Sequence, residues 1–378
     1  MNILLFSLSK IMSSSGGITK AYAELANALV EHGHYVTAVY TDNSVSASFF
    51  KFNRKINFYN LGLRYKNNCR IKLYALLSGT LQKKHKIKYY GYGHILAPKI
   101  ERIIQSDKPD IIICFQPRAA LIIKNILHCT IPTILSCHRR PEEILEDNQG
   151  LNILEKCDVI HTLSPSQAKI IASSIHNRRI VSIGNAAPEY TEKIISYQTR
   201  KIINVASFSE DKNQLLLIEA FNKVSRDNPT WTLEFWGSTT IHSSYYKKCV
   251  RLVKKHGLTS KISFRGITSH VSQKLSDSSI FAFPSMYESF PLSLMEAMSI
   301  GLPTIGLRSC TGVNELIEDN INGFLCENNI NHFASQLTRL MNDELLRKSF
   351  GISAKKSIQK YSRENVWHQW ESLLDSLL

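Results

Sequence analysis

The sequence predicts an α/β protein built from two doubly wound, Rossmann-like domains, and two observations support this prediction. First, short apolar segments alternate with amphipathic helical segments along the whole chain, a pattern typical of parallel sheets covered by helices on both faces. Second, the alternation occupies both halves of the 378 residues, a length that corresponds to two domains of about 150–200 residues each. Hydrophobic residues make up 43% and charged residues 20%, which is the composition of a globular chain.

The first half contains six apolar segments of strand length. They are Ile3–Leu8, Tyr35–Tyr40, Ile56–Tyr59, Ile111–Phe115, Thr133–Cys137 and Val159–Leu163. A helical segment follows the first of them at residues 18–33, where apolar residues recur at i, i+3/i+4 and i+7 until Gly33 ends the pattern. Strands and helices therefore alternate here as βαβ units.

The second half shows the same alternation. Its predicted strands are Ile202–Val205, Thr232–Trp236, Ile262–Phe264, Ile280–Phe283 and Pro303–Leu307, with helices around Gln214–Arg226 and His332–Met341. The polar segment from Pro188 to Arg200 separates the two halves, so we predict domains at residues 1–188 and 189–360. Residues 361–378 are amphipathic and form a predicted terminal helix.

Several features indicate a protein that stays in the cytosol. The N-terminus lacks the positive region and cleavage site of a signal peptide, and no apolar run approaches the roughly 18 residues that span a membrane. The eight cysteines form no CxxC pair and have no zinc-ligand spacing with histidines. We therefore expect no metal site and no disulfide framework, which agrees with a reducing compartment.

The net charge of +15 is concentrated in the first half. Residues 1–188 hold 24 Lys/Arg against 12 Asp/Glu, and no acidic residue lies between Asp42 and Glu101. The densest cluster contains Lys83, Lys84, Lys86 and Lys88 beside three tyrosines. Basic and aromatic residues together suit an anionic membrane surface, although a solvated face or a nucleic-acid surface would have the same composition. No RNP, helix-turn-helix or zinc-finger pattern supports nucleic acid.

Ligands bind doubly wound domains at the carboxyl ends of the strands, so the loops there are the candidate sites. Gly16 and Gly17 follow the first strand and let the backbone approach a ligand, or form an ordinary turn. His138 follows a strand and either contacts a substrate hydroxyl or is a capping histidine. Lys212 lies near the start of a helix, where it neutralises a phosphate or is simply solvated.

The most informative segment runs from residue 280 to 307. Glu288 follows a buried strand, and Pro291 and Gly301 mark the start and end of a helix that contains Glu296. Eight residues are about two helical turns, so both carboxylates can face one cleft. Carboxylates accept hydrogen bonds from sugar hydroxyls, and the N–H groups at the helix start suit a diphosphate. A capped helix with a solvated glutamate explains either carboxylate alone, but not the whole assembly with its flanking prolines and glycine.

These residues resemble glycosyltransferase family 4, whose members are retaining nucleotide-sugar transferases with the GT-B fold. The E-x7-E motif of the family corresponds to Glu288 and Glu296, and residues 312–325 match its G-x-x-E-L-I…N-G-F stretch. Phe264–Gly266 matches a strand-end F-x-G element. Elements of the first domain, including Gly16-Gly17, His138, Asp158–Ser164 and Asn185, follow in the order of the family.

The resemblance implies two domains that face a central cleft, and it implies a role for each candidate residue. Glu288 would contact the donor hexose and Glu296 the ribose. Lys212 would hold the diphosphate, which Gly16 and Gly17 approach from the first domain, while His138 lies near the transferred sugar and the acceptor. In members of this fold the terminal helix, here residues 361–378, crosses back onto the first domain.

The resemblance also assigns the rest of the donor site. Arg265 and Ile267 would flank the base, and the backbone of residues 289–292 would follow the sugar and diphosphate, although Pro291 has no N–H to donate. This backbone belongs to Ser289, Phe290, Pro291 and Leu292. One departure concerns Ser207, which stands where the family often has an arginine that binds phosphate. Another is the E-S-F-P sequence in place of E-G-F-G, which alters the wall beside the sugar.

The function implied is transfer of a sugar, expected to be a UDP-linked hexose or N-acetylhexosamine, to an acceptor hydroxyl with retention. The sequence has no Asp-x-Asp motif, so we expect a metal-independent reaction without a cofactor. The basic first domain suggests a lipid-linked saccharide acceptor at the cytoplasmic membrane, in capsule, O-antigen, lipopolysaccharide or exopolysaccharide assembly. Two alternatives remain open: a nucleotide-sugar epimerase of related fold, and a non-catalytic GT-B-like binding protein.

Overall fold

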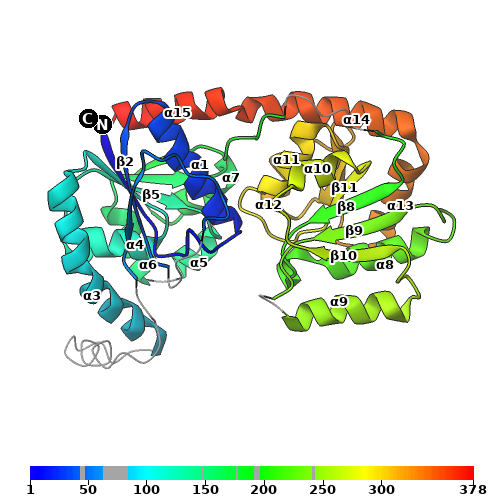
Figure 1. The fold of residues 1–378 in the computed structure, drawn as a ribbon, viewed down its shortest axis with the longest axis horizontal. Helices are drawn as coiled ribbons and strands as arrows, with labels where there is room; N and C mark the ends of the chain where they lie inside the picture. Colours follow the sequence, from blue (N-terminus) through cyan, green and yellow to red (C-terminus); the bar gives the residue numbers. More distant parts are fainter. Residues whose placement is uncertain (43–46, 63–83, 147, 176–177, 191–195, 241–242) are drawn as a thin grey trace. The chain divides into compact units, whose positions relative to one another are not determined.

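The computed structural model describes the chain except for residues 43–46, 63–83, 147, 176–177, 191–195 and 241–242 (Figure 1). The chain forms two compact units. The first consists of Met1–Gly184 together with Trp367–Leu378, and the second of Asn185–Val366. The division therefore falls slightly before residue 188, and the terminal segment joins the first unit from Trp367 onward.

The first unit is a parallel sheet of seven strands in the order β3-β2-β1-β4-β5-β6-β7. Its strands are β1 (Asn2–Phe6), β2 (Tyr35–Tyr40), β3 (Asn57–Asn60), β4 (Ile111–Cys114), β5 (Thr133–Cys137), β6 (Val159–Thr162) and β7 (Arg179–Ser182). Its helices are α1 (Gly17–Glu31), α3 (Lys84–Asp107), α4 (Pro117–Leu121), the π-helical turn η1 (Ile122–Ile126), α5 (Pro141–Leu145), α6 (Asn148–Lys156) and α7 (Pro165–Ala172), together with the part of α15 (Arg363–Asp375) that follows Val366.

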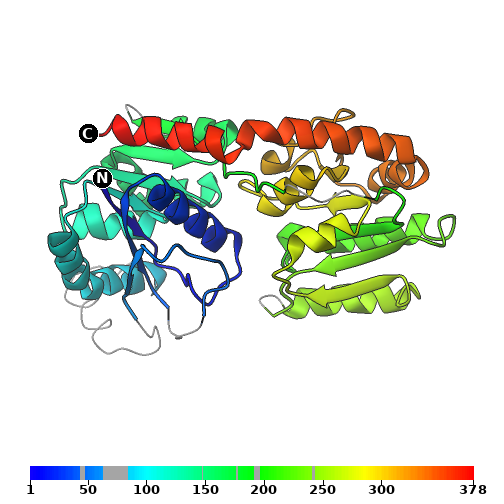
Figure 2. The same ribbon diagram turned by 45° about the horizontal axis from the view of Figure 1, so that its top comes forward.

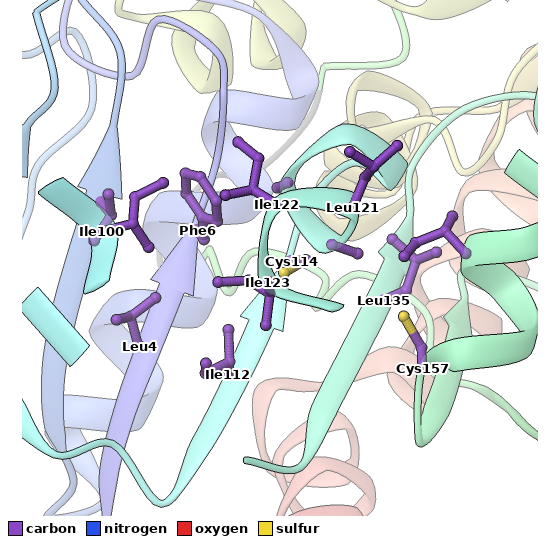
Figure 3. Close-up of a cluster of buried hydrophobic side chains, with 14 of the residues drawn as sticks. Leu4, Phe6, Ile100, Ile112, Cys114, Leu121, Ile122, Ile123, Leu135 and Cys157 are labelled. Carbon is purple, nitrogen blue, oxygen red and sulfur yellow. The ribbon is translucent and has the colours of Figure 1, made fainter. Parts of the chain in front are cut away.

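The core of the first unit explains why its strands are continuous apolar runs. Strands β4, β5 and β6 are buried at every residue, as expected where helices cover both faces of a parallel sheet. Strand and helix side chains interdigitate in one cluster. Figure 3 shows part of it, with labelled side chains from β1, β4, β5 and η1: Leu4, Phe6, Ile112, Cys114, Leu135, Ile122 and Ile123.

The second unit is a parallel sheet of six strands in the order β10-β9-β8-β11-β12-β13. The strands are β8 (Lys201–Val205), β9 (Thr232–Trp236), β10 (Ile262–Gly266), β11 (Ile280–Phe283), β12 (Thr304–Leu307) and β13 (Gly323–Cys326). The helices are η2 (Glu210–Lys212), α8 (Gln214–Val224), α9 (Ser243–Lys255), α10 (Val271–Ser276), α11 (Leu292–Ile300), α12 (Thr311–Asn314), α13 (Ile330–Asn342), α14 (Glu344–Ser357) and η3 (Ile358–Tyr361).

Local sequence signals set several helix ends in the second unit. Helix α11 begins just after Pro291 and ends at Gly301, whose φ of 91° is readily adopted only by glycine. Helix α13 begins at the Asn329 side chain, which accepts hydrogen bonds from two backbone N–H groups of the first turn. Figure 1 shows α8 beside α9 and α10 beside α11, and both pairs pack together.

The end of the chain packs on the first unit. The indole ring of Trp367 stacks on the imidazole of His32 with 3.9 Å between the ring centroids, and Trp370 packs against His161 at 4.6 Å. In Figures 1 and 2, both chain ends lie close together in this unit. From Trp367 onward, helix α15 is therefore part of the first unit, although its first turn, from Arg363 to Val366, belongs to the second.

Two strands were not predicted from the sequence. Strand β7 is a half-exposed edge strand that includes a serine and an arginine, so it lacks the apolar run of a central strand. Strand β13 begins at Gly323, where a Cβ atom would lie 2.4 Å from the Thr304 hydroxyl oxygen on the neighbouring strand. Glycine is needed because β13 and β12 approach each other closely at this point. The glycine leaves an apolar run of only three residues in β13. The other predicted strands are present with ends shifted by at most two residues.

The basic cluster predicted in the first half lies largely outside the described residues. Lys83 is not described, and Lys84, Lys86 and Lys88 lie at the start of α3, where only the backbone is described. Among the described residues, no helix combines the length and the apolar character that crossing a membrane requires.

Candidate active site

The strand order of the second sheet predicts where a ligand binds. The order reverses between β8 and β11, and the loops that follow these two neighbouring strands diverge there. The loop after β8 leads into η2 and carries Lys212, and the loop after β11 carries Glu288. Two of the predicted site residues therefore lie at the topological switch point of their domain.

Lys212 and Glu288 form an ion pair across this switch point. The distance from Lys212 Nζ to Glu288 Oε1 is 2.5 Å, and the side chains are only 22% and 13% exposed. A backbone hydrogen bond of 2.7 Å from the Met286 N–H to the Asp211 carbonyl ties the two loops together. Asn213 ends η2 with a φ of 50°, which turns the chain into α8 directly after Lys212. The pair is thus held by backbone on both sides.

Gly312 supports the backbone of Glu288, a role that the sequence did not reveal. A Cβ atom at Gly312 would lie 2.4 Å from the Glu288 carbonyl oxygen and 3.0 Å from that of Ser289. Nearby, burial raises the pKa of the Cys310 thiol to about 12, and the charge of Glu288 adds to the shift. The glycine lies in the G-x-x-E stretch, so the motif marks a close backbone approach at this point.

The helix after Glu288 places the second carboxylate. Glu296 lies in α11 and is 8% exposed, so it points into the protein rather than into solvent. Phe290 is also buried, and its ring packs against Tyr361 at 5.0 Å. The Tyr287 and Ser289 hydroxyls are hydrogen-bonded at 3.0 Å. Pro291 and Leu292 stand on either side of the start of the helix.

The predicted base-flanking residues lie on the other half of the same sheet. The Arg265 guanidinium pairs with Glu234 at 3.1 Å, and Ile267 is 53% exposed just after β10. Ser207 lies in the loop after β8, where its carbonyl accepts a hydrogen bond of 3.0 Å from Gln214. The structure thus brings Lys212 together with Glu288, whereas Arg265 has a carboxylate partner of its own.

In the first unit, the glycine loop also lies where the strand order reverses, between β1 and β4. Gly16 caps α1, which begins at Gly17. Buried Asp42 holds the loop by accepting hydrogen bonds from the Ser13 N–H at 2.9 Å and from its hydroxyl at 2.8 Å. Gln116 also stabilises the loop, because its Oε1 accepts a hydrogen bond of 2.8 Å from the Leu8 N–H. Asp42 and Gln116 were not predicted as site residues, although each lies two residues after the end of a strand.

His138 follows β5 directly. Its imidazole stacks on the ring of Phe115 with 4.9 Å between centroids, and Nε2 lies 2.8 Å from the hydroxyl oxygen of Ser136. Burial, and to a lesser extent His161, lowers the pKa of His138 to about 3. At neutral pH the ring is therefore uncharged and acts as a hydrogen-bonding group.

Within the described residues, no three His, Cys, Asp or Glu side chains gather closely enough to hold a metal ion. The described cysteines are free thiols. For Cys137, Cys249 and Cys326, burial raises the thiol pKa to about 12, so these residues behave as small apolar side chains.

Comparison with protein families assigns both units. The family described as "Glycosyltransferase Family 4" matches residues 15–188, and that described as "Glycosyl transferases group 1" matches residues 188–357. An uncharacterized glycosyltransferase of Haemophilus influenzae is 24% identical over 96% of this chain and 97% of its own length. The N-acetyl-alpha-D-glucosaminyl L-malate synthase of Bacillus anthracis is 25% identical over 97% of this chain and 95% of its own.

A third relative is the poly(ribitol-phosphate) alpha-N-acetylglucosaminyltransferase of Staphylococcus aureus, 26% identical over 73% of this chain and 57% of its own length. Among solved structures, sucrose-phosphate synthase from Thermosynechococcus elongatus has a TM-score of 0.82 at 16% identity, covering 100% of this chain and 98% of its own. A mutant of S. aureus TarM in complex with fondaparinux, alpha-GlcNAc-glycerol and UDP has a TM-score of 0.76 at 16% identity, covering 98% and 99%. The chain therefore belongs to the glycosyltransferases, with a family 4 domain followed by a group 1 domain in the GT-B fold.

Proposed function

We propose that this glycosyltransferase moves a sugar from a nucleotide-diphosphate sugar to an acceptor hydroxyl with retention of configuration. The observation that carries the proposal is the Lys212–Glu288 pair at the switch point of the second sheet, with Nζ and Oε1 2.5 Å apart. A diphosphate needs a cation, and a sugar ring needs hydrogen-bond acceptors for its hydroxyl groups. The pair supplies both within one small site.

Each residue then has a role that its position supports. Lys212 binds the diphosphate and stabilises the charge that develops on it as the sugar departs. Glu288 accepts hydrogen bonds from sugar hydroxyls, and Glu296 accepts them from the ribose. The N–H groups at the start of α11 face the phosphates together with the backbone of residues 289–292. The family resemblance assigns Gly16 and Gly17 of the first domain to the diphosphate, and His138 to the transferred sugar and the acceptor.

The leaving diphosphate itself takes the acceptor proton on the face from which it departs, so the reaction requires no protein nucleophile. Positioning of the two substrates and stabilisation of the leaving group account for the rate. We propose that Lys212 supplies this stabilisation without a metal ion. Before the donor binds, Glu288 balances the charge of Lys212, so a partly buried cation is not left unpaired.

We propose a UDP-linked hexose or N-acetylhexosamine as the donor. Two of the sequence relatives bear names that specify N-acetylglucosaminyl transfer, and a structural relative was solved with UDP. These names describe those proteins, and the site here has the groups that such a donor requires.

The test is a transfer assay with UDP-glucose and UDP-N-acetylglucosamine in the presence of a chelator, with a simple lipid-linked saccharide as acceptor. NMR of the product reads the anomeric configuration. We expect an α-linked product from the α-linked donor at undiminished rate in the chelator. A β-linked product would contradict retention, and loss of activity in the chelator would contradict metal independence.

We further propose that the enzyme works at the inner face of the cytoplasmic membrane on a lipid-linked acceptor, in the assembly of capsule, O-antigen or exopolysaccharide. The excess of basic residues between Asp42 and Glu101 supports this, because each basic residue near an anionic surface contributes about 1 kcal/mol. The same reasoning makes Lys83, Lys84, Lys86 and Lys88 the membrane-contacting cluster.

Charge reversal of these four lysines to glutamate is expected to abolish binding to vesicles that contain anionic phospholipid, measured by co-sedimentation. The matched control reverses four exposed lysines of α9 in the second unit, which changes the net charge equally and is expected to preserve binding. The control residues are Lys247, Lys248, Lys254 and Lys255. Unchanged vesicle binding after reversal of the first four would contradict the membrane assignment.

Gly312→Ala is expected to lower kcat/KM about 100-fold, because an added Cβ atom 2.4 Å from the Glu288 carbonyl oxygen must displace the backbone that carries this carboxylate. Overpacking of this kind also destabilises by about 1–3 kcal/mol. Steady-state kinetics and thermal unfolding separate the two effects. Thr311→Ala changes an exposed neighbour on the same helix and is the control. Wild-type activity in Gly312→Ala would show that the close approach does not position Glu288.

A further inference from the structure

Two buried side chains continue the hydrogen bonding of His138 into the first unit. The Ser136 Oγ lies 2.8 Å from Nε2 of His138 and 2.7 Å from Nδ1 of His161, which is on the neighbouring strand β6. Nε2 of His161 lies 2.8 Å from the carbonyl oxygen of Ile183. Ser136 and His161 are only 1% and 2% exposed. The groups therefore form one chain of three hydrogen bonds that ends at a backbone carbonyl.

The carbonyl fixes the direction of every bond in this chain. A carbonyl oxygen can only accept, so Nε2 of His161 carries a hydrogen. If the ring is neutral, its Nδ1 has none and accepts from the Ser136 hydroxyl. That hydroxyl has a single hydrogen, so it must accept from His138 rather than donate to it. Nε2 of His138 is then the protonated nitrogen, and Nδ1 is an acceptor.

Both rings are neutral because their surroundings disfavour the cation. Burial lowers the pKa of His161 to about 4, although the hydrogen bond to Ile183 acts in the opposite direction. Burial also lowers the pKa of His138 to about 3, and His161 adds to that shift. Phe115 stacks on His138, and Trp370 of α15 packs on His161 with 4.6 Å between ring centroids. The terminal helix thus covers the inner end of the chain.

We propose that Ser136 and His161 are positioning residues that hold His138 in its Nε2–H tautomer, so that Nδ1 is a hydrogen-bond acceptor at the end of β5. The consequence for catalysis rests on the proposed function, in which both substrates bring hydroxyl groups that donate to such an acceptor. A neutral ring in this tautomer has no hydrogen to give from Nδ1. His138 therefore orients a hydroxyl and does not protonate a leaving group from that nitrogen.

The tautomer can be measured directly by NMR of the full chain labelled with ¹⁵N-histidine at pH 7. His138→Gln identifies the His138 resonances by their disappearance. We expect a proton-bearing, pyrrole-type Nε2 and a pyridine-type Nδ1 for His138. A proton on Nδ1, a cationic ring or an even mixture of tautomers would overturn the proposal. The measurement needs no substrate, so it stands even if the transfer assay finds no activity.

Variants of Ser136 test the coupling. Ser136→Ala is expected to release His138 into a mixture of tautomers and to lower kcat about 10- to 100-fold with a smaller change in KM. Ser136→Thr keeps the hydroxyl and is expected to keep the tautomer. Ser182→Ala removes a hydroxyl bonded to Thr162 at 2.9 Å on the same sheet and is the control. An unchanged His138 tautomer in folded Ser136→Ala would overturn the proposal, and if that variant does not fold, the wild-type spectrum still decides.

Discussion

Glu288→Gln is expected to lower kcat about 100- to 1000-fold without weakening UDP binding. Glutamine has nearly the same shape but carries no charge, so it accepts weaker hydrogen bonds from the sugar hydroxyls where positive charge develops on the ring. In the wild-type protein the Lys212 ammonium lies 2.5 Å from the Glu288 carboxylate. Loss of the carboxylate charge leaves this ammonium to pair with the diphosphate alone. The dissociation constant for UDP is therefore expected to stay the same or to fall. Steady-state kinetics and calorimetric titration of the same preparation measure the two effects.

The matched control for this substitution is Glu210→Gln. Glu210 is a carboxylate in the neighbouring loop that also pairs with a lysine, Lys248 at 3.4 Å, but its side chain is 75% exposed. Exposed pairs contribute little, so wild-type kinetics are expected. Full activity in Glu288→Gln would remove this carboxylate from the reaction and would favour a binding protein that retains the fold. A large loss of UDP affinity would mean that Glu288 binds the nucleotide rather than the sugar.

Lys212→Met is expected to weaken UDP binding, unlike Glu288→Gln. The substitution removes the cation and keeps an apolar side chain of similar length. We expect UDP affinity to fall about 10- to 100-fold, since a hydrogen bond to a charged group is worth about 1.5–3 kcal/mol. Glu288, only 13% exposed, is then left without its lysine and repels the phosphates, which adds to the loss. Calorimetry with UDP measures the affinity, and kcat is expected to fall as well because the leaving group loses its cation.

A control variant and a double variant test whether the effect of Lys212→Met on UDP affinity is specific. Lys248→Met removes an exposed lysine from a comparable ion pair and is expected to leave UDP binding unchanged. The double variant with Lys212→Met and Glu288→Gln removes both charges, so part of the lost affinity is expected to return relative to Lys212→Met alone. Strictly additive effects in this cycle would show that the pair does not act together on the diphosphate.

The sequence predicted most of the fold because burial on both faces gives the central strands an unbroken apolar signal. Strand β5 was predicted with the observed ends, and β11 likewise. Strands at the sheet edges carry less of this signal. Strand β7 is partly exposed. Strand β13 is buried at every residue but begins with the glycine that its close approach to β12 requires, so neither sequence has a long apolar run.

Site residues that bind a ligand directly could be predicted from the sequence. Residues that act by contacting another protein residue could not. Lys212 and Glu288 could be found from their places after strands and from the family motif. Their direct pairing could not, because it depends on β8 and β11 lying side by side, far apart in sequence. Gly312, Asp42 and Ser136 act through other residues. Only the structure shows that a Cβ atom at Gly312 would be too close to the Glu288 carbonyl oxygen, or that the Ser136 hydroxyl is hydrogen-bonded to two imidazole rings.

The most direct experiment is calorimetric titration of the wild-type protein with UDP, GDP and ADP in the presence of a chelator. If Lys212, Glu288 and the start of α11 form a donor site that works without metal, one of the three nucleotides binds saturably with one site per chain, and the proposed donor makes UDP the expected one. Repeating the titration with anionic vesicles covers a site that requires the membrane. No saturable binding of any of the three nucleotides, with or without vesicles, would contradict a nucleotide-sugar site at this position.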